Sequence, residues 1–292
     1  MSPPIEVADL RLRYGNVAAL DGLTFTLDGG KIYGLLGRNG SGKTSLLSVL
    51  AAFCKPSGGT VRIGGQPVFE NPKVTSQVCL IRSTCDTVGR SDRVEVALSF
   101  AADLRPHWDA EYAGTLLDRF GLSPRKTIGS LSRGQRSALG AVLGLAARAP
   151  VTLFDESHLG MDVPTRYLFY DELLSDFIAH PRTFVLSTHL IDEVGALFED
   201  VVIIDRGRLV LHEEVEALRS RGVAVTGPAE AVDRIVNGYP VLGERQLGPT
   251  KSTTIYGPIH DSLLERARAA GLELGPVGLQ DLFIHLTEKE PA

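Results

Sequence analysis

The sequence contains few cysteines: among 292 residues there are only Cys54, Cys79 and Cys85. None of them forms a C-x-x-C pair, and an odd number of cysteines argues against a disulfide framework. We therefore expect reduced, partly buried thiols, as is usual in cytosolic proteins.

Long apolar runs are also absent. No segment approaches the roughly 18 uncharged apolar residues that a membrane-spanning helix needs. The best candidate, residues 137–147, is bounded by Arg136 and Arg148. The first fifteen residues, MSPPIEVADLRLRYG, lack the apolar centre of a signal peptide. The sequence therefore predicts a soluble chain that needs a partner for any role at a membrane.

An excess of positive charge is missing as well. The net charge is −5, and no run of lysine and arginine of the kind that binds nucleic acid occurs. We therefore expect no nucleic-acid partner. The remaining composition, 43% hydrophobic and 22% charged, is that of an ordinary globular protein. The length suffices for one large domain or for a large and a small one.

Strands and helices alternate through the first two thirds of the chain. Apolar patterning predicts strands at Ile5–Arg13, Leu23–Leu27, Ile32–Leu36, Val151–Phe154, Thr183–Leu186 and Val201–Asp205. It predicts helices at Ser45–Phe53, Val94–Ala102, Tyr112–Phe120, Gln135–Ala147, Arg166–Ala179 and Ile191–Phe198. This alternation favours a mainly parallel α/β sheet, with a helical subdomain at about residues 87–147.

The pattern changes after about Arg221. Six segments follow in the order strand, helix, strand, strand, helix, strand: 223–226, 229–237, 241–247, 251–256, 260–270 and 272–277. This order is typical of a ferredoxin-like α+β domain. We therefore expect one domain at residues 1–221 and a small one at 222–292, which ends in a helix at Leu279–Thr287.

The segment Gly37-Arg-Asn-Gly-Ser-Gly-Lys-Thr44 matches the P-loop pattern G-x-x-x-x-G-K-[ST] between a strand and a helix. Glycines let successive backbone N–H groups point at phosphate oxygens, Lys43 adds a positive charge, and the Thr44 hydroxyl can bind Mg²⁺. The alternative, a plain glycine-rich turn, does not require this spacing. The nucleotide-binding residues expected here are Gly37, Asn39, Gly40, Ser41, Gly42, Lys43, Thr44 and Ser45.

Two carboxylates end the apolar run Val151-Thr-Leu-Phe-Asp-Glu156. Taken alone, such a pair is usually a strand that meets solvent. Beside a P-loop, however, Asp155 can hold Mg²⁺, and Glu156 can orient or deprotonate the attacking water. We therefore expect Lys43 and Glu156 to be catalytic.

Further motifs resemble the ATP-binding subunit of an ABC transporter over about residues 5–212. Leu131-Ser-Arg-Gly-Gln135 is similar to the signature LSGGQ of that family, with Arg133 in place of a glycine. Asp162 matches the aspartate of the D-loop, His189 the switch histidine, and Tyr14 the aromatic residue that stacks on adenine. All of these motifs occur in the order of the family.

The resemblance implies a P-loop cassette of this family, with a mixed sheet core and with antiparallel β and helical subdomains. It further implies ATP and Mg²⁺ as cofactors, and a head-to-tail pair with a second ATP-binding subunit. In that pair, Ser132, Gly134 and Gln135 would face the γ-phosphate bound by the partner, and His189 would contact it within its own chain. Integral membrane permease subunits would be the further partners, at the inner face of the cell membrane.

The sequence departs from the family at the Q-loop. Ser83 stands where the family has a glutamine that reaches Mg²⁺, and its side chain is two bonds shorter, so that a bridging water would be required. We therefore expect slow or partner-dependent hydrolysis. Ser157 and His158 replace the proline and threonine that are common after the catalytic glutamate, and neither change removes a group needed for phosphoryl transfer.

The carboxyl-terminal segment Gly278–Thr287 resembles that of drug-efflux subunits and favours export, although as a bare pattern it is an amphipathic helix.

Two alternatives remain beside the transporter subunit. A soluble ATPase of the same family, acting in translation or on chromosomes, normally has two cassettes or long coiled coils. A nucleotide-gated regulatory module is supported by Ser83 and opposed by the intact Lys43, Asp155, Glu156 and His189.

Overall fold

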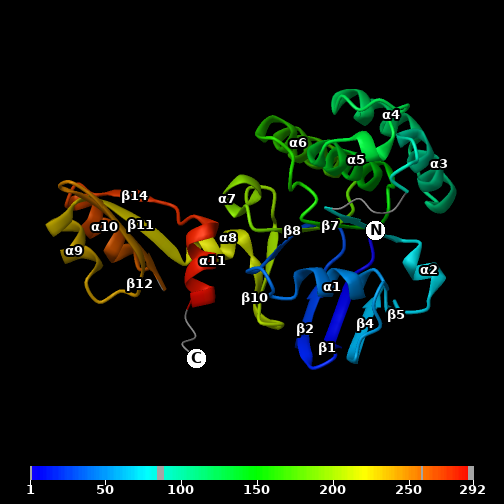
Figure 1. Cartoon of the computed structure of the whole chain (residues 1–292). Coiled ribbons are helices and arrows are strands. Elements are labelled where there is room, and N and C mark those ends of the chain that lie inside the picture. The colour runs from blue at the N-terminus through cyan, green and yellow to red at the C-terminus, as the bar shows by residue number, and fades with distance from the viewer. Residues whose placement is uncertain (1, 84–88, 258, 289–292) are drawn as a thin grey trace. The chain divides into compact units, whose positions relative to one another are not determined.

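The computed structural model describes residues 2–83, 89–257 and 259–288. Its contacts divide the chain into two compact units (Figure 1). The first comprises Met1–His189 and Val202–Leu211, and the second comprises Leu190–Val201 and His212–Ala292. Within the described ranges, no helix combines the length and the apolar content needed to cross a membrane.

An antiparallel sheet opens the first unit, with the strand order β2-β1-β4-β5. Its strands are β1 (Ile5–Tyr14), β2 (Val17–Leu27), β4 (Gly58–Ile63) and β5 (Gln66–Pro67). The predicted strand Leu23–Leu27 is thus only the second half of β2. Its first half, Val17–Ala19, is largely exposed and lacks the alternation that indicates a strand.

A six-stranded sheet follows, in the order β10-β9-β3-β8-β7-β6. Its strands are β3 (Ile32–Leu36), β6 (Val78–Arg82), β7 (Val151–Asp155), β8 (Thr183–Thr188), β9 (Asp200–Asp205) and β10 (Arg208–Glu214). The pairs β3–β8, β8–β7 and β7–β6 are parallel, which confirms the predicted mainly parallel sheet. Strand β10 escaped prediction because it ends in charged residues and is only partly buried.

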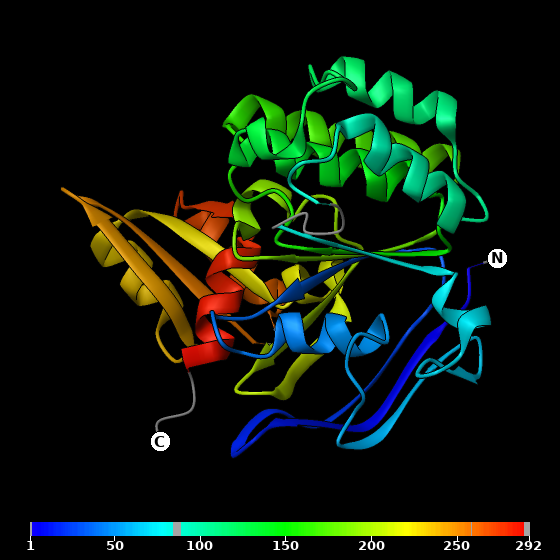
Figure 2. The same cartoon turned by 45° about the vertical axis from the view of Figure 1, so that its right-hand side comes forward.

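Helices cover both sides of this sheet. Figure 2 shows α3 (Val94–Leu104), α4 (Ala110–Arg119), α5 (Arg133–Ala146) and α6 (Val163–Ala179) on one side, and α1 (Lys43–Leu50) on the other. A short helix, α2 (Pro72–Thr75), precedes β6. The prediction of Ser45–Phe53 was wrong at both ends of α1, because the helix begins directly after Gly42 and ends before Ala51.

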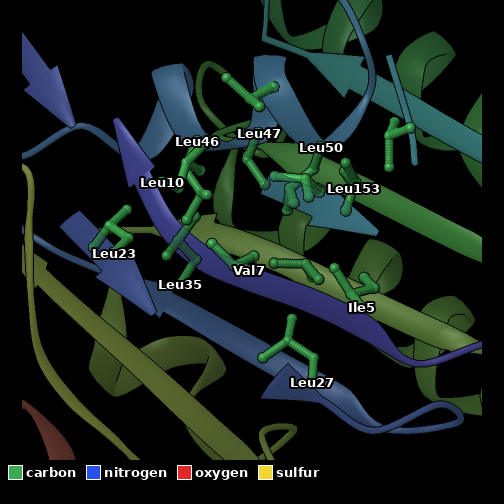
Figure 3. Close-up of a cluster of buried hydrophobic side chains, with 14 of the residues drawn as sticks. Ile5, Val7, Leu10, Leu23, Leu27, Leu35, Leu46, Leu47, Leu50 and Leu153 are labelled. Carbon is green, nitrogen blue, oxygen red and sulfur yellow. The ribbon is translucent and has the colours of Figure 1, made fainter. Parts of the chain in front are cut away.

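Leucines of α1 form the centre of the hydrophobic core. Leu46, Leu47 and Leu50 are buried and point toward strands that carry Val7 and Leu153 (Figure 3). Burying a leucine side chain contributes about 1.5–3 kcal/mol. The core therefore holds the start of α1 at a fixed place beside β3 and β7.

The second unit contains an antiparallel sheet in the order β12-β13-β11-β14. Its elements are β11 (Gly222–Pro228), α9 (Ala229–Val236), β12 (Val241–Leu247), β13 (Thr250–Tyr256), α10 (Asp261–Ala269), β14 (Glu273–Gly275) and α11 (Leu279–Glu288). It also contains α7 (Ile191–Val194) and α8 (Val215–Ser220). Helix α7 is shorter than the predicted helix Ile191–Phe198, since it ends at Val194, directly before Gly195.

Candidate functional site

The loop between β3 and α1 requires its glycines. Gly40 and Gly42 have positive φ angles of 82° and 109°, which other residues rarely adopt. A Cβ atom on Gly42 would lie 2.6 Å from the carbonyl oxygen of Ala19, and one on Gly37 would lie 2.3 Å from Ser41 Oγ. The loop therefore packs tightly in a conformation suited to wrapping an anion.

Lys43 lies against this loop. Its Nζ donates to the carbonyl oxygens of Gly37 and Arg38 at 2.7 and 3.2 Å, and lies 3.8 Å from Glu156 Oε1. Burial lowers the pKa of Lys43, whereas the negative charges of Glu156 and Asp155 oppose this shift. The site thus holds one ammonium group and two carboxylates in close proximity.

Asp155 ends β7 and is buried. Burial raises its pKa, and a hydrogen bond with the Thr44 side chain opposes that shift. Among the residues that the structure describes, its Oδ1 has no hydrogen-bond partner. Leaving a buried polar atom unpaired is costly, and a carboxylate beside a hydroxyl suits a hard divalent cation. Asp155 and Thr44 therefore fit a magnesium ion.

Glu156 and His189 lie next to each other. His189 Nδ1 is 3.6 Å from Glu156 Oε1, and the His189 side chain is 45% exposed. Glu156 has a φ of +48°, a conformation that costs about 1–3 kcal/mol in a residue other than glycine. Its N–H donates to the carbonyl oxygen of Ser187 at 3.2 Å, which ties it to β8. This arrangement can orient a water molecule and accept its proton.

The signature residues begin α5. Ser132 Oγ accepts from the N–H of Gln135, and Gln135 Oε1 accepts from the N–H of Ser132, each at 3.1 Å. This capping box fixes the first turn of the helix. A Cβ on Gly134 would lie 2.6 Å from the carbonyl oxygen of Gly160, so that only glycine fits there. The side chain of Arg133 lies alongside Gly160 and is exposed.

Asp162 caps α6 and accepts a hydrogen bond from the N–H of Thr165 at 3.0 Å. Hydrogen bonds with Thr165 hold the pKa of Asp162 below its usual range.

Tyr14 ends β1, is 51% exposed and has its hydroxyl 3.7 Å from Cys54 Sγ. Its ring is thus accessible to a ligand. Of the three cysteines, Cys54 is partly buried, Cys79 is buried, and Cys85 lies outside the described residues.

Ser83 follows β6, and its N–H donates to the carbonyl oxygen of Asp155 at 3.1 Å. Lys43, Ser83, Asp155, Glu156 and His189 therefore gather at the carboxyl edge of the parallel strands, where α/β sheets bind ligands. Ser132, Gly134 and Gln135 do not join them. Within the described part of the chain, no hydrogen bond or ion pair connects these three residues to the P-loop.

Arg82 is a residue of this region that the sequence analysis missed. Its Nη2 donates to Ser48 Oγ at 3.0 Å, and Ser48 Oγ donates to the carbonyl oxygen of Thr44 at 2.6 Å. The guanidinium group also lies over the ring of Phe53, 4.9 Å from its centroid. Arg82 therefore links the end of β6 to α1. A charged residue at the end of an otherwise apolar strand is the signal that would have indicated it.

An apolar cavity of about 260 Å³ lies between β6 and α3. Among the residues that line it are Leu80, Ile81, Ala97, Phe100 and Leu104. Phe100 and Leu104 are 54% and 70% exposed and lie four residues apart on α3, so that they extend the apolar lining of the cavity onto the surface. The cavity begins on the strand that leads to Ser83. The sequence analysis predicted the helix α3, but it did not predict that this helix has an exposed apolar surface.

Residues 20–158 match a family model described as "ABC transporter". The chain is 27% identical to a Nod factor export ATP-binding protein I of Paraburkholderia xenovorans, over 98% of this chain and 97% of that protein. It is 26% identical to the daunorubicin resistance ATP-binding protein DrrA3 of Streptomyces coeruleorubidus, over 97% and 95% of the two chains.

Solved structures have the same fold. One titled "Structure of ATP binding subunit of ABC transporter" superposes with a TM-score of 0.67 at 24% identity, and covers 74% of this chain and 92% of that one. The predicted α/β cassette is thereby confirmed.

Proposed function

We propose that this chain is an ATP-binding subunit of the ABC transporter family, and that its P-loop and β7 edge hydrolyse ATP to drive export by separate membrane subunits. The geometric observation that carries this proposal is the gathering of Lys43, Asp155, Glu156 and His189 at one sheet edge. Export as the direction is supported by the names of the full-length relatives, which concern Nod factor export and daunorubicin resistance.

ATP would lie with its phosphates in the loop Gly37–Gly42 and its adenine on Tyr14. Lys43 would leave the carbonyl oxygens of Gly37 and Arg38 to contact the β- and γ-phosphates. Thr44 and Asp155 would hold Mg²⁺, which neutralises charge that develops on the phosphate oxygens. The unpaired Oδ1 of Asp155 supports this assignment.

Glu156 would accept a proton from the attacking water as the water oxygen bonds to the γ-phosphorus and the bond to the β–γ bridging oxygen breaks. His189 would donate a hydrogen bond to a γ-phosphate oxygen. His189 Nδ1 lies 3.6 Å from Glu156 Oε1, and this short distance supports a position of both side chains beside the γ-phosphate. Lys43 would stabilise negative charge on the same oxygens.

Two chains would close head-to-tail, so that the signature of one completes the site of the other. In support, Ser132, Gly134 and Gln135 start a 14-residue helix and have no polar contact with the P-loop of their own chain within the described ranges. The N-terminus of this helix and the Gly134 N–H suit the γ-phosphate of the partner.

Light scattering tests this pairing. With MgATP, the Glu156→Gln variant should double in mass, and Ser132→Trp in the same background should stay monomeric because the bulky ring blocks the partner site. A monomeric Glu156→Gln chain that still binds MgATP would contradict the head-to-tail pair.

Ser83 marks where this chain departs from a fast ATPase. A glutamine at this position would have the reach toward Mg²⁺ that serine lacks. We expect Ser83→Gln to raise kcat by about threefold to tenfold, within the span of one ordinary hydrogen bond. Steady-state phosphate release measures this, with Ser91→Gln on the exposed surface as the control. An unchanged or lower kcat would show that Ser83 does not limit turnover.

The cavity beside β6 would receive an apolar helix of a membrane subunit, and the chain would then lie on the inner face of the cell membrane. The exposed side chains of Phe100 and Leu104 beside an apolar cavity support this partner, since contiguous apolar surface is typical of protein interaction sites.

For the second unit we infer a ferredoxin-like arrangement. The strand order β12-β13-β11-β14, its antiparallel pairs, and the helices α9 and α10 between strands support this inference.

A further inference from the structure

The end of strand β6 lies beside both residues that fit Mg²⁺, Thr44 and Asp155. In the register of the sheet, Arg82 of β6 pairs with Asp155 of β7, and the two strands are parallel. Paired residues of neighbouring strands direct their side chains to the same face of a sheet. Here that face carries α1, because Asp155 has a hydrogen bond with the Thr44 side chain and Arg82 donates to Ser48. Arg82 is therefore the neighbour of Asp155 on the face that carries the P-loop helix.

The Arg82 side chain reaches the first turn of α1 through one hydroxyl group. Its Nη2 donates to Ser48 Oγ at 3.0 Å, and Ser48 Oγ donates to the carbonyl oxygen of Thr44 at 2.6 Å. Ser48 is only 4% exposed, so its hydroxyl depends on these protein partners. The guanidinium group also lies over the ring of Phe53, 4.9 Å from its centroid, a contact that favours one orientation of the arginine. Arg82 thus has a defined position although it is the exposed end of its strand.

The backbone of the same strand end holds the other residue of the pair. The N–H of Ser83 donates to the carbonyl oxygen of Asp155 at 3.1 Å. Thr44 and Asp155 come from two different elements, α1 and β7, so their spacing depends on the contacts that connect these elements. The end of β6 contacts both, β7 through its backbone and α1 through Arg82. All of these residues belong to the first compact unit.

We propose that Arg82 is a positioning residue for Mg²⁺: through Ser48 it holds Thr44 at the distance from Asp155 at which both can bind the same ion. This inference rests on the proposed assignment of Thr44 and Asp155 to Mg²⁺. Magnesium demands a nearly ideal octahedral set of oxygen atoms, so that a small displacement of one ligand weakens its binding. The link matters in this chain because Ser83, the next residue, lacks the reach to contact the ion directly.

The positive charge of Arg82 acts in the opposite direction to its link. A cation near the site repels Mg²⁺ and attracts metal-free ATP, which carries more negative charge than MgATP. Loss of the charge alone would therefore favour the binding of MgATP over that of metal-free ATP. Loss of the link would disfavour MgATP. The direction of the change thus distinguishes a positioning residue from a mere surface charge.

Nucleotide affinities of the full chain test the proposal. The readout is the ratio of the Kd for ATP in EDTA to the Kd for MgATP, measured by titration calorimetry in the Glu156→Gln background, which prevents turnover. Arg82→Met should lower this ratio by about threefold to tenfold through weaker MgATP binding, the span of one ordinary hydrogen bond. Ser48→Ala, which keeps the charge of Arg82, should also lower it. The double variant should equal Arg82→Met, since both changes remove the same link.

Arg62→Met is the matched control. Arg62 is an exposed arginine of β4, in the other sheet of the same unit, and its Nη1 donates to the carbonyl oxygen of Gly65 at 2.9 Å. The replacement removes the same charge and one hydrogen bond, and it should leave the ratio unchanged. Asp155→Asn tests the premise and should lower the ratio about tenfold or more, because it removes a charged ligand of the ion.

Three results would overturn the proposal: an unchanged or higher ratio in Arg82→Met, an unchanged ratio in Ser48→Ala, or additive effects in the double variant. Equal losses of affinity for ATP and MgATP leave the ratio unchanged and count against it in the same way. An unchanged ratio in Asp155→Asn would instead contradict the assignment of Asp155 to Mg²⁺ in the proposed function. That outcome is distinct from a failure of the Arg82 and Ser48 variants alone.

Discussion

Replacing Glu156 with glutamine should lower kcat for ATP hydrolysis by about 100-fold to 10,000-fold, the range that general-base catalysis supplies. An amide of the same size keeps the packing but cannot accept the proton of the attacking water. The Kd for MgATP should stay within about threefold, because glutamine removes a negative charge near the phosphates and leaves Lys43 in place. Phosphate release and nucleotide titration measure the two quantities.

Glu95→Gln is the matched control, since Glu95 lies on the exposed side of α3 in an ion pair with Arg93. Its kcat should equal that of the unmodified chain. A Glu156→Gln chain that retains more than a tenth of the activity would show that another group accepts the proton. The backbone conformation of Glu156, with a positive φ, already indicates that this residue is placed at some energetic cost.

Replacing Asp176 with alanine should produce a large loss of stability. Asp176 lies on α6, its side chain is 1% exposed, and it forms ion pairs with Arg148 and Arg182. Burial lowers the pKa of Arg182 to about 10, so it stays charged at neutral pH. Removing the carboxylate leaves the buried Arg182 without its carboxylate partner, and leaves the partly buried Arg148 with Asp109 alone. Breaking such a pair costs about 3–5 kcal/mol, which corresponds to a Tm decrease of about 10 °C.

Asp171→Ala on the same helix is the control, because Asp171 is exposed. Its Tm should change by less than about 2 °C, as for an ordinary surface substitution. Differential scanning calorimetry distinguishes the two variants. Equal Tm values for Asp176→Ala and Asp171→Ala would show that the ion pairs contribute no net stability.

The P-loop and β7 were the parts most readily predicted from sequence. Both depend on local spacing: the glycines between Gly37 and Gly42 encode a backbone path, and the run before Asp155 encodes a buried strand. The same holds for the carboxyl-terminal strands and helices, whose order was predicted nearly residue by residue. Local patterns suffice where the neighbours in space are also neighbours in the chain.

Other features depend on residues that are distant in the chain. Arg82 acquires its place through Ser48, and Gly134 is required because Gly160 approaches it. The ion pairs of Asp176 join α6 to Arg148 and Arg182. No periodicity in the sequence indicates such pairs, since each partner alone resembles a surface charge.

The central claim is that this ATPase drives a membrane-spanning partner. Affinity purification of the tagged full chain from detergent-solubilised membranes of its source tests it most directly, with Leu104→Asp as the matched variant. The account predicts that a protein with several membrane spans is recovered in stoichiometric amounts with the unmodified chain and is lost with Leu104→Asp. Recovery of soluble proteins alone, or of the same membrane protein with both chains, would contradict it.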